Sequence, residues 1–225
     1  MAYSLIANVA AGSTTGNTIT TAGIDTTGAS FLVAVISDYA GGSSTISDSK
    51  SNTWAALTAY SSNNDRVCIY YVTTPTVGSA HTFTSTGTGN YSVISAAAFS
   101  GSAASSPFDQ QTGQNNYNAN TPGKSIVVGS ITPTEDNELV ITGLTGFAAN
   151  TVSIDLSFSI TNQTTFVGSQ HLLGAMAYKI QTTAAAVNPT WSWPTTDMTC
   201  AAAIASFKAA AAAGSGKPWF AYAQQ

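Results

Sequence analysis

An internal repeat constrains the fold of this chain more than any other feature of its sequence. One self-alignment offset dominates over some 70 positions, and it equals 108 residues, the distance from Phe31 to Leu139. The matched positions keep their apolar character: Phe31-Leu32-Val33 falls on Leu139-Val140-Ile141, Tyr39-Ala40 on Phe147-Ala148, Phe83 on Trp191, and Ala97 with Phe99 on Ala205 with Phe207. A near-constant offset over this length indicates an internal duplication of the core.

Each copy is predicted to be a series of short strands. Runs of β-branched, aromatic or alternating residues are separated by Gly-, Ser- and Asn-rich breakers. We predict strands at 31–37, 46–48, 54–59, 66–73, 81–85 and 91–99 in the first copy, and at 138–144, 152–158, 172–181, 188–193 and 200–208 in the second. Helical periodicity competes only in the alanine runs, so the chain is predicted to be all-β.

Two architectures fit this pattern. The preferred one is a single jelly-roll-like antiparallel β-sandwich over residues 1–208, in which repeats at 19–100 and 127–208 interleave. The alternative is a pair of tandem immunoglobulin-like sandwiches. The segment between the copies, Gly101 to Lys124, is interpreted as a long polar excursion over the surface. The strand predicted at Tyr3–Ala10 has no recognised counterpart in the second copy and is expected to pair with that excursion.

The low content of charged residues argues against nucleic acid as a partner of this chain. Charged residues make up 7% of the chain, against roughly 25% in an average soluble domain. Six Lys and Arg residues without a basic cluster do not supply the attraction to phosphate that nucleic-acid binding requires. Neither a membrane span nor a signal peptide is recognised in the sequence. Cys68 and Cys200 fall in predicted strands and are interpreted as small buried hydrophobic residues, with a bridge between the copies left open.

The segment 209–225 differs in composition from the repeats. Five alanines and Gly214-Ser215-Gly216 form a predicted flexible linker, and three aromatic residues follow it. Aromatic side chains anchor interfaces through the area that they bury. We therefore predict that the segment binds a partner, through the residues Pro218, Trp219, Phe220 and Tyr222.

The sequence contains no recognisable catalytic constellation, so we predict a non-enzymatic protein without cofactor or metal. Glu135 and Glu138 are the only glutamates, and at three residues apart in one predicted turn they cannot face each other across a cleft. Most aspartates lie beside Gly, Ser, Thr or Asn and are interpreted as turn acceptors. His81 and His171 begin strands, where we expect structural hydrogen bonding. The loops 47–52 and 63–65 offer oxygen ligands of the calcium type but no carboxylate cluster.

Carbohydrate binding is the main functional alternative. Trp191 and Trp193 stand two residues apart on a predicted strand, so both rings point to one face, where a pair of indoles could stack on sugar rings. Packing in the core is the competing interpretation, because Trp191 aligns with Phe83 of an ordinary alternating strand. Trp54 is likewise expected to be a core anchor. The polar run Gln110–Asn120 is a second candidate for a sugar site.

Several segments resemble a broad group of β-sandwich proteins of bacteriophage particles and bacterial surfaces. They are Ile46–Trp54, Ile69-Tyr70-Tyr71, Ala97–Gly101 and Ser106-Pro107-Phe108-Asp109. The resemblance implies a concanavalin- or jelly-roll-like sandwich with a structural or adhesive role, and it transfers no active site. Without a signal peptide, the virion members of the group are the better match.

These observations lead to one functional expectation and two alternatives. We expect a non-enzymatic virion protein, of the capsid decoration or head-fibre type or else from the tail, located on the virion surface. Its expected partners are the major capsid protein or another virion structural protein, further copies of itself and, as a secondary prediction, host-surface glycans. The alternatives are an extracellular carbohydrate-binding or adhesin module and a subunit of an extracellular filament, in which the C-terminal segment fills a sheet edge of the next copy.

Overall fold

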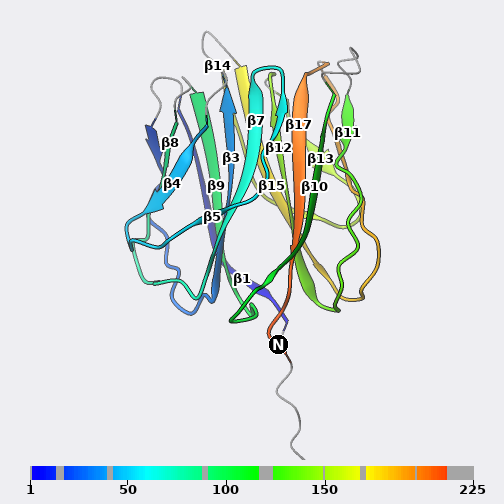
Figure 1. Cartoon of the computed structure of the whole chain (residues 1–225). Helices are drawn as coiled ribbons and strands as arrows, with labels where there is room; N and C mark the ends of the chain where they lie inside the picture. The colour runs from blue at the N-terminus through cyan, green and yellow to red at the C-terminus, as the bar shows by residue number, and fades with distance from the viewer. Residues whose placement is uncertain are drawn as a thin grey trace, which may run out of the picture.

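The residues that the structure describes form seventeen β-strands and no helix (Figure 1). This computed structural model describes residues 2–13, 18–39, 43–87, 91–116, 124–148, 150–167, 171–195 and 197–211. The first copy contains β1 (Ser4–Ser13), β2 (Thr18–Thr20), β3 (Phe31–Tyr39), β4 (Thr45–Asp48), β5 (Ala55–Ala56), β6 (Tyr60–Ser62), β7 (Asp65–Thr73), β8 (Phe83–Thr86) and β9 (Tyr91–Ser100). The second contains β10 (Phe108–Asn115), β11 (Ser125–Val127), β12 (Glu138–Gly146), β13 (Ser153–Ile154), β14 (Ser159–Val167), β15 (His171–Gln181), β16 (Thr190–Ser192) and β17 (Cys200–Phe207).

The strands form two large and two small antiparallel sheets. One large sheet has the order β1-β9-β3-β7-β5, with β6 also paired to β7, and the other has the order β10-β17-β12-β15-β14. The small sheets are β2-β8-β4 and β11-β16-β13. The predicted all-β antiparallel sandwich is therefore confirmed. The strands of the two copies do not interleave, however, because each copy supplies its own large and its own small sheet.

The duplication is visible in the strand register. In the first copy Phe31 pairs with Phe99, and Asp38 with Ser92. In the second copy the pairs are Leu139 with Phe207 and Gly146 with Cys200, so both members of each pair are displaced by 108 residues. The self-alignment thus predicted not only which residues are apolar but also which strands lie next to each other.

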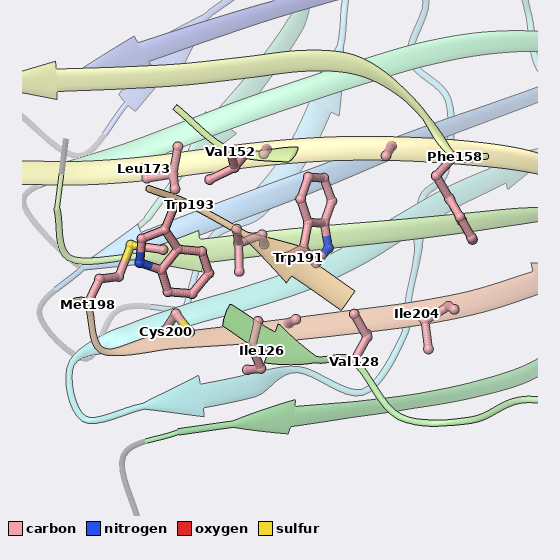
Figure 2. Close-up of a cluster of buried hydrophobic side chains, with 14 of the residues drawn as sticks. Ile126, Val128, Val152, Phe158, Leu173, Trp191, Trp193, Met198, Cys200 and Ile204 are labelled. Atoms are coloured by element: carbon pink, nitrogen blue, oxygen red, sulfur yellow. The ribbon is translucent and has the colours of Figure 1, made fainter. Parts of the chain in front are cut away.

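The side chains of the central strands point alternately to the two faces of their sheet, and this alternation explains how the sheets stack into layers. Phe31, Val33 and Val35 of β3 pack against the other copy, in a core shared by the two large sheets. Leu32, Ala34 and Ile36 belong to an outer core between the large sheet and the small sheet of the same copy. Because both faces of β3 are covered, the strand is a continuous apolar run. A matching outer core around Trp191 completes the second copy (Figure 2).

The N-terminal strand differs from its prediction. β1 does have a counterpart, β10, which occupies part of the segment that we interpreted as a surface excursion. β1 pairs with β9 and not with that segment, and β10 pairs with β17 in the same way. Each pairing also carries a bulge near its start, between Leu5 and Ala7 in β1 and between Phe108 and Gln110 in β10. Strand β14 was also not predicted, and the strand predicted at 152–158 is limited to β13.

Two glycines allow the large sheets to approach each other. A methyl group at Gly143 of β12 would lie 2.5 Å from Val35 Cγ1, and one at Gly174 of β15 would lie 2.5 Å from Val93 Cγ1. Both partners are β-branched side chains with little rotamer freedom. The shared core is consequently packed too tightly at these points to accept another carbon atom.

We expect the substitution Gly143→Ala to lower the free energy of unfolding by about 1–3 kcal/mol, the usual cost of overpacking. Urea unfolding of the purified chain measures this loss. The double variant Gly143→Ala with Val35→Ala removes the methyl groups that the new carbon meets, so its loss should be smaller than the sum of the two single losses. Strict additivity of the two losses would contradict the proposed contact.

The described chain begins and ends at one pole of the sandwich (Figure 1). The Tyr3 hydroxyl donates a hydrogen bond to the Lys208 carbonyl oxygen at 3.0 Å. The Ala210 amide donates to the Gly101 carbonyl at 2.7 Å, and Ser102 forms an isolated bridge with Ala209. The start of β1, the end of β17 and the connection between the copies therefore meet at this pole, which we call the terminal pole.

Candidate functional site

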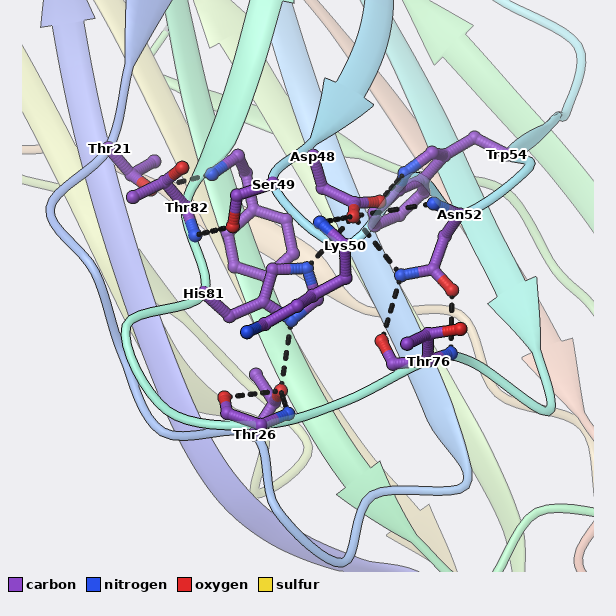
Figure 3. Close-up of polar contacts among 12 residues, drawn as sticks. Thr21, Thr26, Asp48, Ser49, Lys50, Asn52, Trp54, Thr76, His81 and Thr82 are labelled. Carbon is purple, nitrogen blue, oxygen red and sulfur yellow. Dashed lines mark hydrogen bonds and ion pairs between the residues drawn. The ribbon is translucent and has the colours of Figure 1, made fainter.

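The carboxylate of Asp48, at the end of β4, organises the densest polar network among the described residues (Figure 3). Its Oδ1 accepts hydrogen bonds from the Lys50 amide at 2.8 Å and from the side-chain amide of Asn52 at 3.1 Å. Its Oδ2 accepts a bond of 2.6 Å from the indole Nε1 of Trp54. The segment Ser47–Trp54 thus wraps around one carboxylate, as expected for an aspartate that caps a turn.

A buried histidine extends this network into the interior. His81 Nε2 lies 3.0 Å from Asp48 Oδ1, and His81 Nδ1 lies 2.9 Å from Thr26 Oγ1. The ring also stacks on Phe83 with a centroid separation of 4.5 Å. Burial by itself raises the pKa of Asp48, but hydrogen bonds led by that of Trp54 outweigh it and hold the pKa below its usual value.

The row of Thr26, His81 and Asp48 has the order of groups found in hydrolase triads, but its geometry is that of a structural anchor. Thr26 and His81 are fully buried, so no substrate reaches the hydroxyl in this conformation. The Thr26 hydroxyl is also engaged by Gly78, whose amide donates to it at 3.1 Å. This agrees with the structural role predicted for His81.

A surface cleft opens beside the network. It has a volume of about 350 Å³ and is lined by Ser44, Thr45, Ile46, Trp54, Ala56 and Tyr70. Trp54 is half-buried: it packs on the outer core of the first copy and also forms a wall of the cleft. It is therefore the core anchor that we predicted, and in addition a surface residue.

A second buried carboxylate supports the back of this cleft. Asp38 accepts hydrogen bonds from the Ser44 hydroxyl and from its amide, and Arg66 Nη1 lies 3.2 Å from Asp38 Oδ2. The Tyr70 hydroxyl donates to the Ser44 carbonyl oxygen. Burial raises the pKa of Asp38 despite these partners and raises that of Tyr70 to about 12. The cleft thus has a rigid back wall.

Charged side chains gather at the terminal pole. Lys208 Nζ lies 3.4 Å from Glu135 Oε1 and 3.7 Å from Asp109 Oδ1. The hydrogen bond to Glu135 raises the pKa of Lys208. Glu138 Oε1 accepts from the Glu135 amide at 2.9 Å, so the two glutamates do share one turn, as predicted. A hollow of about 240 Å³ between Ala2, Glu135 and Ala211 lies at the same pole.

The turn prediction is confirmed for Asp25 and Asp48, each of which accepts a hydrogen bond from the backbone amide two residues further along the chain. Asp136 and Asp155 instead accept from amides of distant segments, and Asp109 lies within β10. Asp38, near the end of β3, and Asp65, at the start of β7, are buried instead. Within the described ranges no group of three or more His, Cys, Asp or Glu side chains is arranged to hold a metal ion.

The two tryptophans that we predicted as a possible sugar-binding pair lie in the core. Trp191 and Trp193 do point to one face, but that face is the outer core of the second copy (Figure 2). Trp191 is 0% exposed and Trp193 3% exposed, and Trp191 Nε1 donates to Thr142 Oγ1 at 3.1 Å. Trp191 is enclosed in this way and cannot stack on a sugar, so its interpretation as a core residue is the right one. Trp193 packs in the same core, but it also lines a surface hollow of about 460 Å³ with Val152 and Pro194.

The structure places some of the other residues singled out in the sequence, and the rest lie outside the described ranges. Cys68 and Cys200 are buried and unpaired, as small hydrophobic residues would be. Part of the run Gln110–Asn120 lies in β10, and its residues Gln114 and Asn115, with Asn116 just after the strand, line a cleft of about 450 Å³ with β11. The predicted partner-binding residues Pro218, Trp219, Phe220 and Tyr222 lie outside the described residues.

The described part of the chain contains no helix long and apolar enough to cross a membrane. No protein-family model matches the chain, and neither does any curated protein or solved structure.

Proposed function

We propose that this chain is a non-enzymatic structural protein of a virion, displayed on the particle surface and attached at the terminal pole. The observation that carries the proposal is the meeting of both described ends at one pole, joined by Tyr3 to Lys208 and by Gly101 to Ala210. A module held at a single pole projects the rest of its surface away from the attachment point.

The distribution of charge supports the same proposal. The chain has only six Lys and Arg and ten Asp and Glu residues, and Lys208, Asp109 and Glu135 of this small set gather at the terminal pole. Charged groups at an attachment site can fix the orientation of a partner. The rest of the surface, rich in Ser and Thr, suits a module that is exposed to solvent on a particle.

We assign the attachment to the segment that follows Ala211 in the sequence. Its aromatic residues Trp219, Phe220 and Tyr222, preceded by Pro218, form the proposed anchor. The proposed partner is the major capsid protein or another structural protein of the particle, with homo-oligomers as a further form of assembly. If the partner is another copy of this chain, the same anchor would build a filament.

Removal of Gly214–Gln225 is expected to abolish incorporation into particles while leaving a folded sandwich. Particles purified from producing cells are probed for the chain, and thermal unfolding confirms that the truncated protein is folded. A matched pair sharpens the test: Trp219, Phe220 and Tyr222 replaced together by alanine should lose incorporation, whereas Gln224→Ala with Gln225→Ala should retain it. Normal incorporation of the truncated chain would refute the attachment.

A further inference from the structure

A comparison of equivalent positions in the two copies of the repeat shows which features of a residue are needed for packing. The pairing of Ala55 with Tyr71 in the first copy corresponds to that of Ser159 with Tyr178 in the second. The residues just before these strands, Trp54 and Phe158, are therefore structural equivalents. Phe158 is buried in the outer core of its copy. An ordinary apolar aromatic residue thus satisfies the packing requirement at this position.

Trp54 has features that packing does not require. Its indole N–H is held by Asp48 at 2.6 Å, and its ring meets Phe83 edge-on, with centroids 6.0 Å apart and planes at 83°. In the strand register, Asp48 lies opposite Phe83, and Ile154 lies opposite Trp191, the equivalent of Phe83. The positions of Asp48 and His81 are therefore taken by Ile154 and Pro189 in the second copy. The second copy therefore folds without this buried polar network.

The polar network around Asp48 therefore does more than stabilise the fold, because it also orients a side chain at the surface. It fixes the plane of the Trp54 ring through Asp48 (Figure 3). The ring is half-buried and forms a wall of the cleft lined by residues of β4 and β5. An aromatic ring held in a set orientation binds a flat apolar partner without losing further side-chain entropy. Trp54 is thus a preorganised platform.

The lining of the cleft selects the chemistry of its ligand. Ile46 and Ala56 add aliphatic surface to the indole, and the exposed Thr45 supplies a hydroxyl. All six lining residues are uncharged, so the cleft has no group that would compensate a charged ligand. Its volume of about 350 Å³ lies within the range of small-molecule sites.

We propose that this cleft binds a neutral pyranose sugar, with one face of the ring stacked on Trp54. A pyranose presents an apolar face of C–H groups and a rim of hydroxyls, which matches an indole bordered by side-chain hydroxyl groups such as that of Thr45. Asp48 acts as a positioning residue through its bond to the indole. The proposal goes beyond attachment at the terminal pole, because the cleft belongs to the first copy alone and includes no residue of that pole.

The test uses the full chain and a panel of neutral methyl glycosides, among them glucosides, galactosides and N-acetylglucosaminides. Saturation-transfer NMR detects the binding, and titration gives the affinity. The wild-type chain should bind at least one of these sugars, and Trp54→Ala should weaken that affinity by about tenfold or more. Trp54→Phe keeps a ring but loses the bond to Asp48, so its affinity should fall between the other two.

A second pair of variants keeps the test valid if Trp54→Ala does not fold. Ala56 lines the cleft, whereas the exposed Ala55 of the same strand points to the other face. Ala56→Arg should therefore block binding, and Ala55→Arg should leave it unchanged. The chain without Gly214–Gln225 should bind as the whole chain does, which separates this proposal from that of attachment.

Three results would overturn the sugar site. They are the absence of binding to any neutral glycoside, unchanged binding in Ala56→Arg, and saturation transfer that persists in Trp54→Ala at the original affinity. Binding of a proline-rich peptide in the absence of sugar binding would assign the cleft to a protein partner instead.

Discussion

Replacement of the buried Asp65 by asparagine is expected to stabilise the protein by about 4 kcal/mol above pH 7. Asp65 begins β7, is 2% exposed and has a carboxylate oxygen, Oδ1, without a hydrogen-bond partner among the described residues. Burial raises its pKa from 3.8 to about 7. The folded protein therefore retains a proton that the unfolded chain releases at lower pH.

The sign of the pH dependence follows from these two pKa values. Between about pH 4 and pH 7 the folded state binds more protons at this site than the unfolded state, so the contribution of Asp65 to stability falls as the pH rises. Above pH 7 both states are ionised, and the full penalty of a buried charge remains. Asparagine has a similar shape and never ionises, so the variant should lose this pH-dependent penalty.

Urea unfolding at intervals between pH 4 and pH 8 measures the difference between variant and wild type. The two proteins should be nearly equal in stability at pH 4 and should diverge steadily as the pH rises. Asp197→Asn, which changes an exposed carboxylate, is the matched control and should give no such divergence. A constant difference across the range would show that Asp65 is not a buried acid.

Truncation of Trp191 to alanine is expected to lower the free energy of unfolding by about 3–5 kcal/mol. The side chain is fully buried at the centre of the small sheet of the second copy, where β16 pairs with both β11 and β13. Alanine would leave a cavity in the outer core and would remove the hydrogen bond to Thr142. Denaturant unfolding at neutral pH measures the loss.

The first copy supplies the control for this experiment. Phe83 takes the equivalent place there and is also fully buried, so Trp191→Phe should cost much less than Trp191→Ala. Thr142 keeps a partner in both variants, because its hydroxyl donates to the Ala203 carbonyl at 2.9 Å. A loss below about 1 kcal/mol for Trp191→Ala would contradict its role as the centre of the core.

The central strands could be predicted because their apolar residues are required on both faces. β3, β9, β12 and β17 are buried along nearly their whole length, so hydrophobicity alone marks them. The edge strand β10 was missed because its sequence, FDQQTGQN, is polar and only half-buried. Its equivalent β1, SLIANVAAGS, is apolar. The two edge strands have diverged where the core places little constraint on them.

The polar network was harder to predict than the fold. Asp48 was recognised as a turn acceptor, but its contact with His81 depends on the pairing of β4 with β8, in which Asp48 lies opposite Phe83. That register cannot be read from short strands with few apolar residues. The sugar-binding prediction was wrong for Trp191 because two equally spaced rings mark one face of a strand without showing whether that face meets solvent.

The arrangement in four layers separates the parts of this protein that are constrained from those that are free to change. The two long sheets are enclosed, since each meets its twin on one side and a small sheet on the other, and a substitution at any position of a central strand therefore disturbs one of two cores. The outer sheets have one face in water and differ already between the copies, in strand length and in the Asp48 network. New binding properties can therefore evolve in one outer layer while the other copy preserves the stability of the whole molecule.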